Sequence, residues 1–364
     1  MIINLFFLPL FVSFLISFFF TPLTILLAKK INLVDNPKTH KLPKVVHRYP
    51  VPRGGGIPIF LSLLTLLLFL PPNKPLMGII IGATIALVVG LLDDKFEEKI
   101  SPFARLATNF LAAGAVVGAG IGISFITNPL SGGVIHLDSP RLVLDILGEK
   151  RSIWVVADIF ALFWISWCMN FVGWSAGVDG QLPGFVAVAA TVIGILSLRF
   201  TQDITQWPVI VLAATTTGAF LGFLPWNFYP QKIMPGYGGK SLAGFLLGTL
   251  SILSGAKLAT AILVLGIPFT DAVFLIFKRI YEGRLPVFGG REHLHHRLLD
   301  LGWSKKKIAC FYWLTSIILG FLALNLNSRQ KFYTMIMLPI ILLIAILWIR
   351  FLSTSLKPPG QGSG

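Results

Sequence analysis

The chain has 364 residues, of which 55% are hydrophobic and only 12% charged, and its mean hydropathy is +0.81. Soluble proteins carry about 25% charged residues, so this composition excludes an ordinary soluble domain and predicts a protein that crosses a bilayer several times. Thirty Lys and Arg side chains against fifteen Asp and Glu give a formal net charge of +15. Basic cytoplasmic loops and anionic lipid or phosphate partners explain this excess, and we expect no nucleic-acid partner.

Eleven apolar runs are long enough, or nearly so, to cross a bilayer, which takes roughly 20 helical residues. The first run has no basic segment before it and no small-residue cleavage site, so we interpret it as a retained helix. The predicted fold class is an all-α polytopic membrane protein with about eleven transmembrane helices. We expect one domain, residues 1–356, and a flexible tail, residues 357–364. The runs are 2–28, 56–70, 76–92, 103–123, 153–172, 183–198, 207–224, 241–253, 257–277, 308–326 and 332–353.

Most Lys and Arg residues fall in alternate connections between these runs. Cytoplasmic loops are enriched in basic residues, so we expect the N-terminus outside, the C-terminus inside and the protein in the cytoplasmic membrane of the cell. The acids and five of the six histidines fall mostly on the same side, which places the polar chemistry on the cytoplasmic face. A transporter would instead carry ionisable residues near the midplane or an internal repeat, and neither is seen. In the outer loop 124–152, alternation after Gly132-Gly133 predicts a short β-hairpin.

Asp93 and Asp94 stand directly after a long apolar run. Acids close to a bilayer are costly and are functional candidates by default. Paired carboxylates also offer hard oxygen ligands where a divalent cation could bridge to a phosphate. The alternative is a solvated helix end. Lys99 and Arg105 follow, and cations beside carboxylates can stabilise ionised acids or contact phosphate.

Two other loops combine glycines with polar side chains. His47, Arg48 and Arg53 surround Gly54-Gly55-Gly56, where glycine N–H groups could cradle an anion. The alternative is a basic loop with a Gly-Pro turn. Asp179 lies between glycines in a segment that interrupts two apolar runs, which suits a ligand or metal site or a plain turn between helices.

The last two motifs are basic. Residues 236–241, Gly-Tyr-Gly-Gly-Lys-Ser, resemble the end of a P-loop, but Met234 stands where its first glycine belongs and the strand-to-helix context is missing. We therefore reject a P-loop. His293, His295 and His296 stand among arginines, without any cysteine. Arginines repel a metal cation, so this cluster favours phosphate recognition over a zinc site.

Together, the motifs resemble those of the polyprenyl-phosphate N-acetylhexosamine-1-phosphate transferases, which form glycosyltransferase family 4. The resemblance spans roughly residues 33–302, and the histidine motif, His-x-His-His-Arg-Leu-Leu-Asp-Leu-Gly, is its most specific part. The eleven predicted helices are more similar to the undecaprenyl-phosphate GlcNAc-1-phosphate branch than to the ten-helix peptidoglycan translocase. The resemblance implies that a polyprenyl phosphate attacks the β-phosphate of a UDP-N-acetylhexosamine. The products would be polyprenyl-diphosphate-sugar and UMP, in the first membrane step of cell-envelope glycan synthesis.

The same resemblance implies Mg²⁺, with Mn²⁺ as an alternative, and a homodimer. It implies catalytic and metal-binding roles for Asp93, Asp94 and Asp179. The histidine motif would hold the diphosphate or the sugar side of the nucleotide. The substrate-binding candidates are His47, Arg48, Arg53, Asn170, Asn227, Lys240, Asp271, His293, His295, His296 and Arg297.

This chain also departs from the family pattern. Gly173 replaces an asparagine, and Ala176 and Tyr237 stand where carboxylates are expected. Lys240 replaces a serine and could place positive charge where a metal would sit. Two hypotheses follow. One is an active transferase with a rearranged metal site on the three remaining acids. The other is a weak or inactive homologue that binds polyprenyl phosphate or a nucleotide sugar.

Overall fold

The structure is a computed structural model that describes residues 2–38, 46–96, 99–146, 149–253, 258–286 and 290–355, so the predicted tail 357–364 lies outside the described residues. Each of the eleven predicted apolar runs contains helix, although residues 119–123 are turn and irregular and residues 153–154 belong to a strand. Two of them are broken into two helices each. The helices are η1 (Ile3–Phe7), α1 (Leu8–Lys30), α2 (Gly56–Leu63), α3 (Leu66–Phe69), α4 (Lys74–Lys95), α5 (Pro102–Gly118), α6 (Val155–Trp174), α7 (Gln181–Leu198), η2 (Ile204–Gln206), α8 (Trp207–Asn227), α9 (Gly236–Leu253), α10 (Leu258–Val264), α11 (Gly266–Tyr281), α12 (Leu294–Asp300), α13 (Lys305–Asn325) and α14 (Ser328–Ser355).

The predicted number of spans is not confirmed. Among the described residues, six helical segments are long and apolar enough to cross a membrane, and α10 with α11, bent by 85°, would make a seventh. Three of the remaining predicted spans differ for identifiable reasons. The run at 56–70 is broken, α5 has only 17 residues, and α9 begins with polar residues. The chain is nevertheless a multi-pass membrane protein by its apolar helices.

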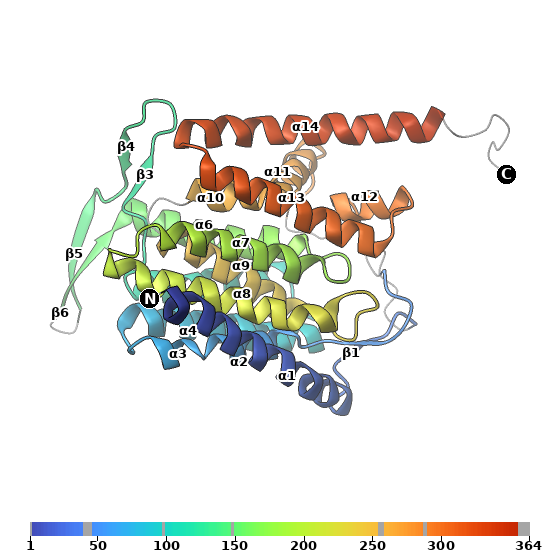
Figure 1. Ribbon diagram of the computed structural model, residues 1–364, viewed down its shortest axis with the longest axis horizontal. Coiled ribbons are helices and arrows are strands. Elements are labelled where there is room, and N and C mark those ends of the chain that lie inside the picture. The colour runs from blue at the N-terminus through green and yellow to red at the C-terminus, as the bar shows by residue number, and fades with distance from the viewer. Residues whose placement is uncertain are drawn as a thin grey trace.

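The helices lie side by side in a stack, with α14 at one edge and α1 at the other (Figure 1). Glycines bring neighbouring helices into close contact. A Cβ on Gly218 of α8 would lie 2.1 Å from the Leu10 carbonyl oxygen of α1, and one on Gly222 would lie 2.3 Å from that of Phe14. This small-xxx-small spacing is typical of packing between membrane helices, where backbone proximity replaces hydrophobic drive.

Two β-hairpins project from one end of the stack, whereas β1 and α12 lie at the opposite end (Figure 1). The predicted hairpin is confirmed, because β3 (Phe125–Thr127) pairs antiparallel with β4 (Val134–His136). A second hairpin, β5 (Arg141–Ile146) with β6 (Glu149–Trp154), was not predicted. At the other end, β1 (Val34–Asp35) pairs with β2 (Val51–Pro52).

A glycine contact joins α2, α4 and α9 at the β1 end. A Cβ on Gly90 of α4 would lie 2.2 Å from Gly238 Cα, and one on Gly56 of α2 would lie 2.8 Å from Gly239 N. Here backbone packs directly on backbone. The contact holds the last turn of α4, which carries the acid pair, against the first turn of α9.

Candidate active site

A cavity of about 310 Å³ opens at the end of the stack where β1 and α12 lie, and residues from all five sequence motifs line it. Four predicted site residues, Arg48, Asp179, Asp271 and Arg297, are not among its lining residues. The other ten are, namely His47, Arg53, Asp93, Asp94, Asn170, Asn227, Lys240, His293, His295 and His296. Arg48 is exposed.

The acid pair lies on one side of the cavity at the end of α4, and both carboxylates are buried. Arg105 of α5 donates from Nε to Asp93 Oδ1 at 2.5 Å. The backbone N–H of Tyr237 donates to Asp94 Oδ1 at 2.8 Å. Asp94 Oδ2 is buried and has no hydrogen-bond partner among the described residues. The pair therefore keeps one acceptor oxygen, on Asp94, available to a ligand.

The first loop supplies a second ion pair. Arg53 Nη2 lies 2.5 Å from Asp35 Oδ2, and Arg53 Nη1 donates to the Asp94 carbonyl oxygen at 3.5 Å. His47 Nε2 lies 3.9 Å from Asp35 Oδ1, and burial lowers the pKa of His47 although Asp35 opposes this. The glycines that were predicted to bind an anion with their N–H groups include one that makes a packing contact instead. Gly55 donates its N–H to the Met234 carbonyl oxygen at 3.1 Å, so this glycine packs the loop against the segment before α9.

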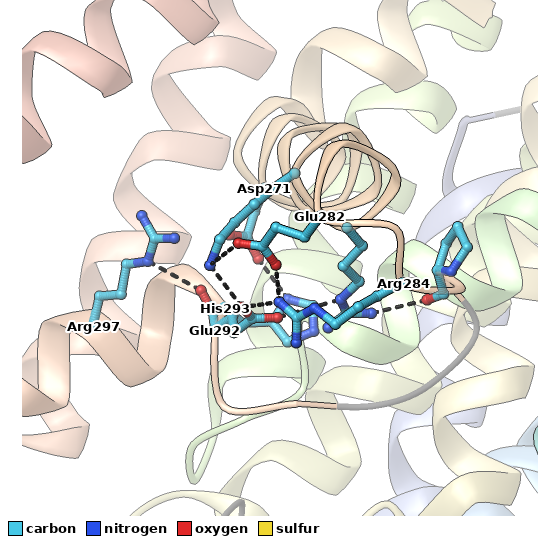
Figure 2. Close-up of polar contacts among 9 residues, drawn as sticks. Asp271, Glu282, Arg284, Glu292, His293 and Arg297 are labelled. Carbon is cyan, nitrogen blue, oxygen red and sulfur yellow. Dashed lines mark hydrogen bonds and ion pairs between the residues drawn. The ribbon is translucent and has the colours of Figure 1, made fainter.

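The histidine motif forms the opposite side. His293 precedes α12, and its Nδ1 lies 2.8 Å from Asp271 Oδ2 of α11 (Figure 2), while Asp271 Oδ1 accepts the Leu294 N–H at 2.9 Å. Asp271 thus anchors the start of α12 and orients His293 without lining the cavity. The rings of His293 and His295 stack with centroids 5.6 Å apart. His295 and His296 each keep a buried Nδ1 without a partner in the described part of the chain.

Burial favours the neutral form of His295 and His296. Burial lowers the pKa of His295 well below its usual value, and the charges of neighbouring histidines and Lys240 act in the same direction. Burial, together with the charge of Arg291, lowers the pKa of His296 to about 4. Near neutral pH both rings can donate one N–H to an anion but add no full positive charge.

A charged cluster behind α12 fixes the loop that leads into it. Figure 2 shows Glu292 with Arg284 beside it, and Arg284 also pairs with Glu282. Lys278 Nζ lies 2.6 Å from Glu292 Oε1, and the hydrogen bond from Lys278 is the largest cause that lowers the pKa of Glu292 to about 2. Arg297 donates from Nε to the Glu292 carbonyl oxygen at 3.0 Å. Arg297 is therefore part of this support and not of the cavity wall.

Asp179 and Asn227 tie loops together. Asp179 is 1% exposed, pairs with Lys305 Nζ of α13 at 3.0 Å and accepts the Gln231 N–H at 3.3 Å. Asn227 Oδ1 accepts the Gly180 N–H at 3.0 Å. Both side chains join the loop between α6 and α7 to neighbouring elements. Asp179, which was predicted to be catalytic, forms a buried ion pair with Lys305 and does not line the cavity.

The predicted metal group is consequently not assembled. Within the described ranges, no three His, Cys, Asp or Glu side chains form a group that could hold a metal ion. Asp93 is bound by Arg105, and Asp179 by Lys305. Asp94 has a buried oxygen, Oδ2, without a hydrogen-bond partner in the described part of the chain. The described residues therefore do not build a magnesium site by themselves, and we derive no step through one; Mg²⁺ in phosphate-transferring sites is usually held by one or two carboxylates together with substrate phosphates. The magnesium prediction stays a prediction.

Arg105, named from the sequence as a cation that could stabilise the acid pair, lines the cavity and binds Asp93, twelve residues before it. Asp35 was not predicted as a site residue, but it lines the cavity and binds Arg53. Nothing in the local sequence indicates that Lys305 reaches Asp179.

Known proteins similar to this chain are transferases of sugar phosphates. A family model described as glycosyl transferase family 4 matches residues 76–255. The chain is 27% identical to the probable undecaprenyl-phosphate N-acetylglucosaminyl 1-phosphate transferase of Bacillus subtilis, over 91% of this chain and 88% of the relative. It is 28% identical to the undecaprenyl-phosphate alpha-N-acetylglucosaminyl 1-phosphate transferase of Thermotoga maritima, over 88% and 89%. It is also 28% identical to the phospho-N-acetylmuramoyl-pentapeptide-transferase of Caldanaerobacter subterraneus, over 79% and 86%.

A cavity at the end of a stack of apolar helices, lined by cations and histidines, is suited to binding phosphate groups beside a membrane. With the matches above, the chain is a sugar-phosphate transferase that is similar to glycosyl transferase family 4 over residues 76–255.

Proposed function

We propose that the chain transfers an N-acetylhexosamine-1-phosphate from a UDP-sugar to a polyprenyl phosphate, giving polyprenyl-diphosphate-sugar and UMP. The observation that carries this is the cavity itself. It gathers Arg53, Arg105 and Lys240 with four buried histidines at the end of apolar helices. A lipid phosphate reaches such a place from the membrane and a nucleotide sugar from water. The names of the relatives, which act on undecaprenyl phosphate and N-acetylglucosamine phosphate, support the same reaction.

In the proposed reaction, an oxygen of the lipid phosphate forms a bond to the β-phosphorus of the donor. The bond between that phosphorus and the bridging oxygen breaks, and UMP leaves with the electron pair. Catalysis of this kind depends mainly on positioning and on stabilising the charge of the phosphoryl oxygens. Arg105 and Lys240 would supply that charge. Asp94 Oδ2 would accept a hydrogen bond or proton from the lipid phosphate, whose second pKa is about 6.

We further propose that the cavity faces the cytoplasm of the cell membrane, with the N-terminus outside, and that the protein forms a homodimer. The distribution of basic residues supports the orientation. Labelling of single cysteines introduced at Ser131, in the β3–β4 connection, and at exposed Arg48, in intact and in opened cells, tests it. Only Ser131→Cys should react in intact cells. The mass of the detergent-solubilised protein tests the dimer.

The activity is tested by UMP release from UDP-GlcNAc or UDP-GalNAc with undecaprenyl phosphate and purified protein. Asp94→Asn should lower turnover at least tenfold, because the amide cannot accept a proton. A second candidate is the weak or inactive binder, favoured by the observation that Ala176 and Tyr237 line the cavity where acids are expected. Donor binding without UMP release from either sugar would establish the binder and overturn the transferase proposal.

A further inference from the structure

We propose that the diphosphate of the donor is bound in this cavity by fixed side-chain cations, Lys240 and Arg105, so that donor binding needs no divalent metal ion. The inference rests on the proposed function, because it concerns the donor of that reaction. It follows from three features of the cavity, which are the position of Lys240, the position of Arg105 and the state of the carboxylates.

Lys240 lies between the two chemical sides of the cavity. It stands on α9, one helical turn after Tyr237, and lines the cavity. Its charge acts on Asp94 on one side and on His295 on the other. Gly173 of α6 faces it, and a Cβ placed there would lie 3.6 Å from Lys240 Cβ. The missing side chain at Gly173 therefore leaves space for the longer side chain at Lys240.

Arg105 places a second cation beside it. Its guanidinium lies over the ring of Tyr237, 5.4 Å from the centroid, while its Nε holds Asp93. The Tyr237 hydroxyl donates to Asn109 Oδ1 at 3.4 Å, so the ring turns toward α5. Tyr237 stands where the family pattern has a metal-binding carboxylate, and its ring contacts the cation Arg105 instead. A guanidinium can stack on an aromatic face and form charge-assisted hydrogen bonds with a phosphate.

The carboxylates around the cavity are already engaged with cations. Asp35 is paired with Arg53, and Asp93 with Arg105. Within the described part of the chain, a divalent cation entering here would meet the unpartnered Asp94 Oδ2 close to three positive side chains that repel it. The same positive side chains attract a diphosphate, because Lys and Arg form charge-assisted hydrogen bonds with phosphate oxygens. His295 and His296 add N–H donors, but they do not complete a group that could hold a metal ion.

Calorimetric titration of the full-length protein in detergent with UDP-N-acetylglucosamine tests this, once in EDTA and once in Mg²⁺. The two dissociation constants should agree within about twofold. Lys240→Ser should weaken binding about 10- to 100-fold in both buffers, the usual loss for a hydrogen bond to a charged group. Lys232→Ser is the matched control, since Lys232 is exposed on the same segment, outside the cavity lining. It should leave binding unchanged.

The reverse change provides a second readout. In the combined variant Ala176→Asp, Tyr237→Asp and Lys240→Ser, donor binding should become at least tenfold tighter in Mg²⁺ than in EDTA. The same variant should also bind Mn²⁺ in an electron paramagnetic resonance titration, which the unsubstituted protein should not. Donor binding that is lost in EDTA by the unsubstituted protein, or kept by Lys240→Ser, overturns the inference and leaves the proposed function standing. Absence of donor binding and of UMP release in both buffers overturns both.

Discussion

The ring of His295 occupies the space that a side chain at residue 177 would fill, because a Cβ on Gly177 would lie 1.9 Å from His295 Nε2. Gly177→Ala should therefore displace the histidine or the loop before α7. We expect a loss of about 1–3 kcal/mol in the free energy of unfolding, typical of overpacking, and at least a tenfold loss of UMP release. Gly118→Ala is the control, since nothing lies within 4 Å of its Cβ position, and it should change neither measurement. Unchanged activity in Gly177→Ala would contradict a role for His295.

Asp271 is expected to act through His293. In Asp271→Asn the new side chain can still accept the Leu294 N–H, but its amide nitrogen would donate to His293 Nδ1 and reverse the tautomer. Turnover should fall about tenfold or more while the melting temperature changes little. Asp300→Asn is the matched control, because Asp300 is an exposed acid that pairs with Arg291 at the surface. A purely structural Asp271 would lower the melting temperature and turnover together.

The buried histidines predict a pH dependence of stability. The pKa of His296 is about 4 in the folded protein, against an ordinary value of 6.5. Between these values the unfolded chain binds more protons than the folded one, so stability is full above pH 6.5 and falls as the pH drops toward 4. His295 adds to this loss, since its pKa is also lowered. Chemical unfolding at several pH values should show a smaller slope for His296→Gln. An equal slope would contradict the neutral histidine.

The ion pair between Asp179 and Lys305 is predicted to stabilise the fold and not to take part in chemistry. Lys305→Met should lower the free energy of unfolding by about 3–5 kcal/mol, because it leaves a buried carboxylate unpaired. Asp179→Asn combined with it should cost less than the two single changes added together. Lys306→Met, at the exposed neighbouring lysine, should stay within about 0.5 kcal/mol. Loss of turnover in Asp179→Asn at unchanged stability would restore the catalytic interpretation.

Much of the fold could be predicted from hydropathy. A segment such as 183–198 is apolar throughout, and only a helix satisfies its backbone in a membrane, so α7 follows directly. The number of spans could not be predicted in the same way. The break at Leu265 bends α10 against α11, and the polar start of α9 lies at the cavity, so neither follows from the length of an apolar run alone.

The sequence indicated which loops form the site, but it did not show which side chains contact each other. The order of motifs indicated that Asp94, Lys240 and His295 belong together, and the cavity contains all three. The sequence could not show which carboxylate would be left for a ligand. That depends on Arg105 and Lys305, which reach Asp93 and Asp179 only because α5 and α13 pack where they do. Residue type defines what a side chain can bind, and packing selects which partner it meets.

The glycine contact among α2, α4 and α9 divides the lining of the cavity into a part that resists substitution and a part that tolerates it. At Gly90 and Gly56 a Cβ would collide with the backbone of α9, which cannot be replaced by a smaller group. The floor under the acid pair is thus fixed by the fold. Changes in what the cavity binds are expected in its walls, from α12 and the loops, where side chains meet side chains and can be exchanged in pairs.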